Sequence, residues 1–263
     1  MMGSTASRRA GEANESRWRV EAFVVGLVIL FVYWQQRSTH LPSLVLPSPS
    51  DTWARLRFLW GSGLIMKELA ISLRRTLAGF GLAYVAALVA GIGMQRYRLV
   101  RFFLQPWLTA VQVVPAVIWL VLSVLWFGIA REVTPIFVVF IVCLPVVVVQ
   151  VREGLAAIPR ELLDLSALEP MGTLMYTRHV YLPALQPFLL SAATLGFSFA
   201  WRSVVFAEFA ASSSGLGYQL SRSYHNLATD DVFAWTIVLV TLMWLWQGLV
   251  VDRWRQAGNP VSL

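Results

Sequence analysis

From Arg152 to Pro183 the chain reads REGLAAIPRELLDLSALEPMGTLMYTRHVYLP, a charged segment between two long apolar runs. One run lies between Glu132 and Arg152, and the other starts near Leu185 and continues past Trp201. Apolar runs of about 20 residues are long enough to cross a hydrocarbon core about 30 Å thick. The pattern therefore predicts two membrane helices, joined by a segment long enough to build a docking structure for a soluble partner.

The composition agrees with a membrane protein. Hydrophobic residues make up 57% of the 263 residues and charged residues only 13%, whereas about 25% of the residues in soluble domains are charged. The apolar runs are continuous and do not alternate, which favours helices over the strands of a barrel. We therefore expect an all-α, polytopic membrane protein.

Four further apolar runs bring the predicted number of spans to six. They are residues 22–34 and the uncharged stretches between Arg75 and Arg96, between Arg101 and Arg131, and between Asp231 and Asp252. The basic start and apolar core of the first run also fit a signal peptide, but no A-x-A cleavage site follows, so we favour an uncleaved span. Six spans place both termini on one side of the membrane.

The polar stretches divide the chain. Residues 1–19 are expected to be a disordered cytoplasmic tail, residues 20–256 the transmembrane domain with a core at 65–255, and residues 257–263 a C-terminal tail. Between the first two spans, LPSPSDTWARLRFLW predicts a short helix in the membrane interface, capped by Ser50 or Asp51.

Basic residues indicate the orientation. They collect in the N-terminal tail, between spans 2 and 3, in the 152–183 segment and after span 6, although the connection after the first span also carries several. Because cytoplasmic loops are enriched in Lys and Arg, we expect both termini and the 152–183 segment in the cytosol. The net charge of +7 is explained by the same bias, and no nucleic-acid partner is expected.

The second span carries a small residue at every fourth position: Gly79, Ala83, Ala87 and Gly91. Such a face lets another helix approach closely. The alternative interpretation is an ordinary alanine-rich span, and the sequence does not name the helix that packs there.

Motifs for independent catalysis are missing from the sequence. No G-x-x-x-x-G-K-[ST] phosphate loop, H-E-x-x-H or G-x-S-x-G occurs, so ATP and Mg²⁺ are expected to bind to a partner and not to this chain. The three His lie in separate loops, and the single Cys143 can form no disulfide within the chain. We expect no catalytic residue, metal site or cofactor.

Two ionisable residues stand out within predicted spans, Arg202 and Glu208 in FAWRSVVFAEFAA. Six residues on one helix are separated by about 240°, so they are not a simple intrahelical pair. Glu208 is either a solvated residue near the outer end of its span or part of a translocation path. Arg202 is either held by snorkelling or an ion pair, or it offers a positive contact to an anionic substrate.

The 152–183 segment and its neighbours resemble the inner-membrane permease subunits of binding-protein-dependent ABC importers, most closely the nitrate, sulfonate and taurine branch. The family's cytoplasmic loop reads roughly E-A-A, three residues, G, nine residues, I-x-L-P. The acidic start and the L-P close match here, whereas the two alanines and the glycine do not. The matching positions are Asp164, Leu165 and Ser166, then Pro170 with Gly172 two residues later, and finally Leu182 and Pro183.

Four other motifs follow the family in the right order, and the resemblance covers residues 50–255. They are SLRRTLAGF at 72–80, VVPAVIWLVLSVLWFG at 113–128 with Pro115, AWRSVVFAE ending at Glu208, and SGLGY at 214–218.

The resemblance implies a type I importer permease with six spans in a prokaryotic inner membrane. Two copies, expected to be a homodimer, would line a path that includes Arg202, Glu208 and Pro115. The 152–183 loop, with Glu161 and Asp164 as polar contacts, would form a coupling helix that sits in a groove of a cytosolic ATPase subunit, of which the assembly would contain two copies. A soluble binding protein would deliver a small anionic solute from outside.

Other interpretations remain open at this stage. The same branch moves vitamin precursors and aromatic acids, and the chain could pair with a different permease. A stand-alone membrane channel or enzyme, or a scaffold without transport, belongs to other functional classes. The 152–183 segment discriminates between them, because its deletion should abolish ATPase association only for an importer permease.

Overall fold

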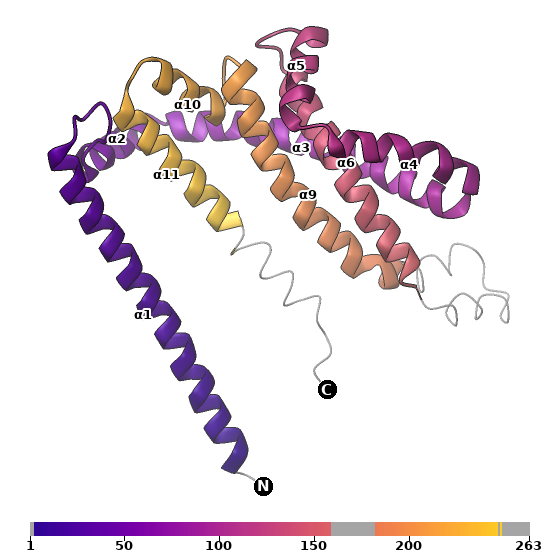
Figure 1. The fold of residues 1–263 in the computed structure, drawn as a ribbon, viewed down its shortest axis with the longest axis horizontal. Coiled ribbons are helices and arrows are strands. Elements are labelled where there is room, and N and C mark those ends of the chain that lie inside the picture. The colour runs from indigo at the N-terminus through magenta and orange to yellow at the C-terminus, as the bar shows by residue number, and fades with distance from the viewer. Residues whose placement is uncertain (1–2, 159–181, 247, 249–263) are drawn as a thin grey trace.

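The computed structural model describes residues 3–158, 182–246 and 248 of the chain, and the described part is helical without strands. Its helices are α1 (Gly3–His40), α2 (Pro49–Gly61), α3 (Leu64–Arg96), α4 (Arg98–Val113), α5 (Ala116–Phe127), α6 (Val133–Ala156), α9 (Leu182–Ala211), α10 (Leu216–His225) and α11 (Thr229–Trp246). Figure 1 shows their arrangement. The expected all-α membrane fold is confirmed.

Four of these helices, α3, α6, α9 and α11, are long and apolar enough to cross a membrane. The pair α4 and α5 makes a fifth candidate, but it is bent by 101°. The bend lies between α4 and α5, at Val114 and Pro115, which are not helical. Val114 is extended because the helical conformation is disfavoured for a residue that precedes proline. The span predicted between Arg101 and Arg131, together with its entry loop, therefore corresponds to a bent pair of helices and not to one straight helix. The predicted first span, 22–34, lies within α1, which is not among these candidates.

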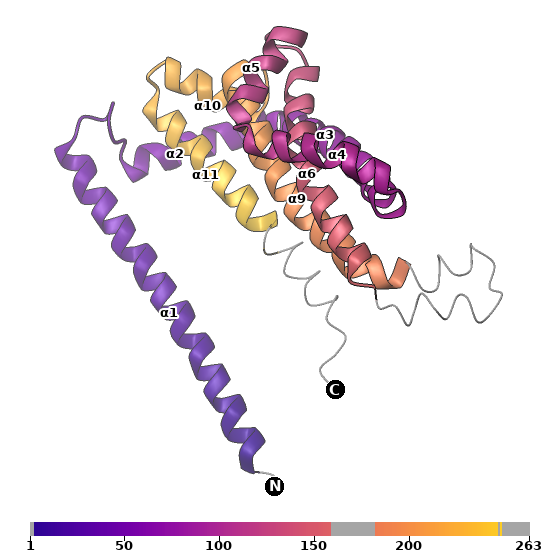
Figure 2. The ribbon, with the colours of Figure 1, turned by 45° about the vertical axis from the view of Figure 1, so that its right-hand side comes forward.

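The core is built from α3, α6 and α9, which lie side by side in Figures 1 and 2. The four residues of the small-residue face of α3, Gly79, Ala83, Ala87 and Gly91, are all buried, and both glycines face α6. A Cβ placed on Gly79 would lie 2.7 Å from Val139 Cβ, and one on Gly91 would lie 2.6 Å from Val151 Cγ1. Since no atom fits in that space, the close-packing interpretation is confirmed and its partner is α6.

Helix α3 is longer than expected. It begins at Leu64, so Arg75 lies inside a membrane-spanning helix and does not mark its end. The apolar pattern is broken at Glu68, Arg74 and Arg75, and the prediction moved the boundary past these charges. This displacement hides the residues that build the site described below.

The N-terminal part of the chain differs from expectation in two ways. Helix α1 runs from Gly3 through the predicted disordered tail and extends away from the other helices (Figures 1 and 2). Helix α2 is capped by Ser48, whose Oγ accepts the backbone N–H of Asp51, and not by Ser50 or Asp51. Helix α2 is tied to α11 by an ion pair between Arg55 and Asp231.

Candidate functional site

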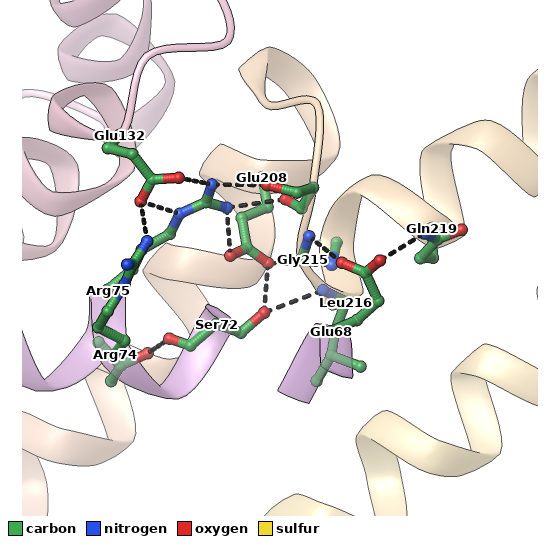
Figure 3. A network of polar contacts seen from close by, with 12 residues as sticks. Glu68, Ser72, Arg74, Arg75, Glu132, Glu208, Gly215, Leu216 and Gln219 are labelled. Atoms are coloured by element: carbon green, nitrogen blue, oxygen red, sulfur yellow. Dashed lines mark hydrogen bonds and ion pairs between the residues drawn. The ribbon is translucent and has the colours of Figure 1, made fainter. Parts of the chain in front are cut away.

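Arg75 lies at the centre of a buried polar network (Figure 3). Its side chain is only 2% exposed. The guanidinium donates to Glu208 Oε1 at 2.8 Å and to the backbone oxygen of Ser214 at 2.7 Å, both from Nη1. Nη2 donates to Ser214 Oγ at 2.8 Å and to Glu132 Oε1 at 2.6 Å, and Nε donates to Glu132 Oε2 at 3.1 Å. All five N–H groups of the arginine are therefore used.

Glu208 of α9 is fully buried and is held by three donors. Besides Arg75, Ser72 Oγ donates to Glu208 Oε2 at 2.7 Å, and the backbone N–H of Gly217 donates to the same oxygen at 3.2 Å. The ion pair is needed because an unpaired carboxylate could not remain charged away from water. The interpretation of Glu208 as a solvated interfacial residue is wrong.

The same network caps α10. The backbone N–H of Gly215 donates to Glu68 Oε2 at 2.6 Å, and that of Leu216 donates to Ser72 Oγ at 2.9 Å. Gln219 Nε2 donates to Glu68 Oε1 at 3.0 Å. Free N–H groups and the helix dipole make a helix start favourable for carboxylates, so two glutamates from other helices stabilise the start of α10.

Gly215 and Gly217, at the start of α10, have no room for a side chain. Gly215 has φ of +101°, and a Cβ there would lie 2.3 Å from the Glu208 carboxylate. A Cβ on Gly217 would lie 2.1 Å from the backbone oxygen of Val205. The backbone can approach the carboxylate only because neither residue has a side chain.

Glu132, which precedes α6, is the outer member of the network. Its side chain is 49% exposed, and it also accepts Arg74 Nη2 at 2.8 Å. The hydrogen bonds from Arg75 hold the pKa of Glu132 below its ordinary value, against a smaller opposing effect of burial. This carboxylate is therefore ionised at neutral pH.

Three of the recognised motifs meet in this network. Arg75 and Ser72 come from SLRRTLAGF, Glu208 ends AWRSVVFAE, and residues 214–217 belong to SGLGY. The sequence interpretation missed Arg75 because it was assigned to a span boundary. A usable signal was present, since Arg75 and Glu208 carry opposite charges next to long apolar stretches and a buried charge requires a partner.

The network lies at the end of the bundle opposite the 152–183 segment. Glu132 directly precedes α6 and Glu208 is near the end of α9, whereas the segment joins the end of α6 to the start of α9. With a rise of 1.5 Å per residue, the 24 residues of α6 separate the two ends by about 36 Å.

The other predicted path residues lie apart from this network. Arg202 is exposed on α9, and its side chain makes no hydrogen bond or ion pair with another residue of the described ranges. The nearest exposed large side chains on the same face of the helix, Phe199 and Phe206, are 42% and 37% exposed. Pro115 is exposed at the break between α4 and α5. The side chain of Glu208 is buried against its partners, so it does not face an open path.

Most of the predicted coupling residues lie outside the described residues: Glu161, Asp164, Leu165, Ser166, Pro170 and Gly172. Leu182 and Pro183 are described, and they open α9 as exposed residues. Together with Phe80 and Tyr84 of α3 they line a groove of about 510 Å³. Leu182 and Pro183 place one end of the groove where α9 begins, next to the 152–183 segment in the chain.

Relatives with transport functions match this chain over most of its length. A probable ABC transporter permease of Brucella melitensis is 32% identical over 223 residues, which is 84% of this chain and 87% of the relative. The riboflavin transport system permease of Chloroflexus aurantiacus is 29% identical and covers 95% of this chain and 96% of its own. The taurine transport system permease of Escherichia coli is 27% identical, with coverage of 83% and 81%.

A solved structure shows the fold of the chain, and a family model shows its family. An inward-facing MetNI methionine ABC transporter chain has a TM-score of 0.61 at 21% identity and covers 74% of this chain and 96% of its own, which shows the fold. The model of the binding-protein-dependent transport system inner membrane component matches residues 79–260. The chain therefore belongs to the family of inner membrane components of binding-protein-dependent transport systems, which are ABC transporter permeases.

Proposed function

We propose that this chain forms the translocation path of an ATP-driven importer for a small anionic solute, with ATP hydrolysis in a separate cytosolic subunit. Family membership supports the permease role. The observation that carries the anionic preference is the exposed Arg202 in the apolar helix α9.

A lone arginine in such a helix needs a reason. The exposed face of α9 is otherwise apolar, with Leu195, Phe199, Phe206 and Phe209 at helical spacing around Arg202. A charge on this face is costly in contact with lipid tails, and it is tolerated where it faces a water-filled path. A guanidinium in such a path binds carboxylates, sulfonates and phosphates through two parallel hydrogen bonds.

The proposed assembly has two permease copies, two ATPase subunits and an extracytoplasmic binding protein. The 152–183 segment is the proposed ATPase contact, because in the chain it connects α6 and α9, two core helices that pack against each other. With the 152–183 segment in the cytosol, both termini are cytoplasmic as well, and the Arg75 network is at the extracytoplasmic end. Movement of the segment would be transmitted through α6 and α9 along their length.

The named relatives support two classes of solute. Permeases for taurine and aliphatic sulfonates are similar to this chain, and a sulfonate group matches Arg202. The riboflavin transport permease covers nearly all of the chain, which favours a vitamin as the second candidate.

Co-purification and uptake test the proposal. The tagged chain should bring down a Walker A subunit from its host membrane in mild detergent, and deletion of 161–176 should abolish this association. In vesicles with the complete importer, Arg202→Ala should lower uptake of a sulfonate at least about tenfold, which corresponds to about 1.4 kcal/mol.

A matched arginine variant serves as the control for the uptake and co-purification experiments. Arg222→Ala removes another exposed arginine, on α10, and should leave both uptake and co-purification unchanged. Unchanged uptake by Arg202→Ala would remove Arg202 from the path. Absence of an ATPase with the segment intact would point to a stand-alone channel or enzyme, or to a scaffold.

A further inference from the structure

We propose that Glu132 is a releasable latch, which holds the corner between α5 and α6 against α3 and lets it open while the rest of the Arg75 network stays closed. The latch concerns the bundle end opposite the 152–183 segment. Its role as a gate of the translocation path rests on the proposed transport function.

The two carboxylates on Arg75 differ in what their departure would cost. Removal of Glu208 leaves a buried cation without its buried partner, which is strongly unfavourable. Departure of Glu132 leaves Arg75 bound to Glu208 and to both oxygens of Ser214. Only two of its five N–H groups are freed, on the side where Glu132 itself is 49% exposed and water can replace it.

Besides Glu132, the corner is held by a hydrogen bond from Thr134 Oγ1 to the backbone oxygen of Gly128 at 2.8 Å and by contacts of Trp126 and Phe127 with Phe137. Ala130 has φ of +60°, a conformation that residues with a side chain rarely adopt. Its N–H donates to the backbone oxygen of Ala211 at 2.8 Å, which ties the corner to the end of α9. Ile129 is 70% exposed, so its own side chain adds little apolar burial that opposes movement of this segment.

The helices before the corner are also loosely packed. Helix α4 has no buried residue, and α5 buries only Leu120 and Ser123. The break at Val114 and Pro115 gives this part of the chain a hinge. By contrast, α3, α6 and α9 pack with no space for a side chain at Gly79, Gly91 or Gly154. Opening therefore involves the corner and α5, and it leaves the core in place.

The latch has a direct test in the purified permease, without solute or ATPase. Spin labels at Ile129→Cys in the corner and Arg222→Cys on α10, in a Cys143→Ser background, report the distance by pulsed electron resonance. With Glu132 present we expect one short population. With Glu132→Gln we expect a longer population, enriched by up to about fivefold, which corresponds to the upper end of about 1 kcal/mol for an exposed ion pair.

Glu132→Asp is the rescue control, because it keeps the carboxylate and should restore most of the short population. Identical distances for wild type and Glu132→Gln would overturn the latch. So would a Glu132→Gln protein that does not fold, because a releasable contact cannot be required for folding. The distance measurement does not depend on transport, so a failed uptake assay would not change its interpretation. Conversely, identical distances would not affect the predictions for Arg202 and for the ATPase association.

Discussion

Replacement of the two network glutamates by glutamine separates a buried ion pair from an exposed one. Glu208→Gln and Glu132→Gln make the same chemical change to two partners of the same arginine. Glu208 is fully buried and accepts from Ser72, Arg75 and Gly217, whereas Glu132 is 49% exposed. Glutamine at 208 removes the negative charge and points an amide N–H₂ group at donors.

The expected magnitudes follow from burial. Loss of one partner of a buried pair typically costs about 3–5 kcal/mol. Because Arg75 keeps Glu132, we expect the lower end for Glu208→Gln, about 3 kcal/mol. Glu132→Gln should cost about 0–1 kcal/mol, the usual range for exposed ion pairs.

Reversible unfolding of the purified permease in mixed micelles with increasing SDS measures both changes. The Glu208→Met, Arg75→Met double variant is the partner experiment. Because it removes both charges, we expect it to be more stable than Arg75→Met alone. Equal losses for the two glutamine variants would refute the reasoning, since exposure would then not determine the cost of losing a partner of Arg75.

Two further predictions concern the same network. Gly217→Ala should destabilise the permease by about 3 kcal/mol, because its Cβ would lie 2.1 Å from the oxygen of Val205; Gly81→Ala, with open space around it, should cause no loss in the same unfolding assay. Because hydrogen bonds from Arg75 depress the pKa of Glu132, its stabilisation should be fully present at neutral pH and lost as the pH falls below the ordinary glutamate value of 4.5. Unfolding of wild type and Glu132→Gln from pH 7 to pH 3 should converge at low pH, and a difference that grows on acidification would contradict the assignment.

Some of the site was accessible to sequence reasoning, and some was not. The small-residue face of α3 and the S-G-L-G-Y motif were visible as patterns, because each depends on residues close together in the chain. The pairing of Arg75 with Glu208 was not, because the two residues lie 133 positions apart. A boundary drawn at Arg75 also removed it from the set of membrane charges that need partners.

The bent pair α4 and α5 shows the same limit. Hydropathy detects an apolar stretch between Arg101 and Arg131 but not its direction. Pro115 was interpreted as part of a family motif and of the translocation path but not as a helix break, although the conformational restriction of Val114 before it explains the 101° bend.

The sequence by itself determined that this protein is a helical membrane permease, because hydropathy and motif order are properties of contiguous residues. Tertiary structure alone decided which charges are neutralised, which are exposed and which glycines cannot be replaced. The physical reason is that burial of a charge depends on its neighbours in space. Arg75 is fully satisfied and Arg202 is exposed, although both are arginines within apolar helices.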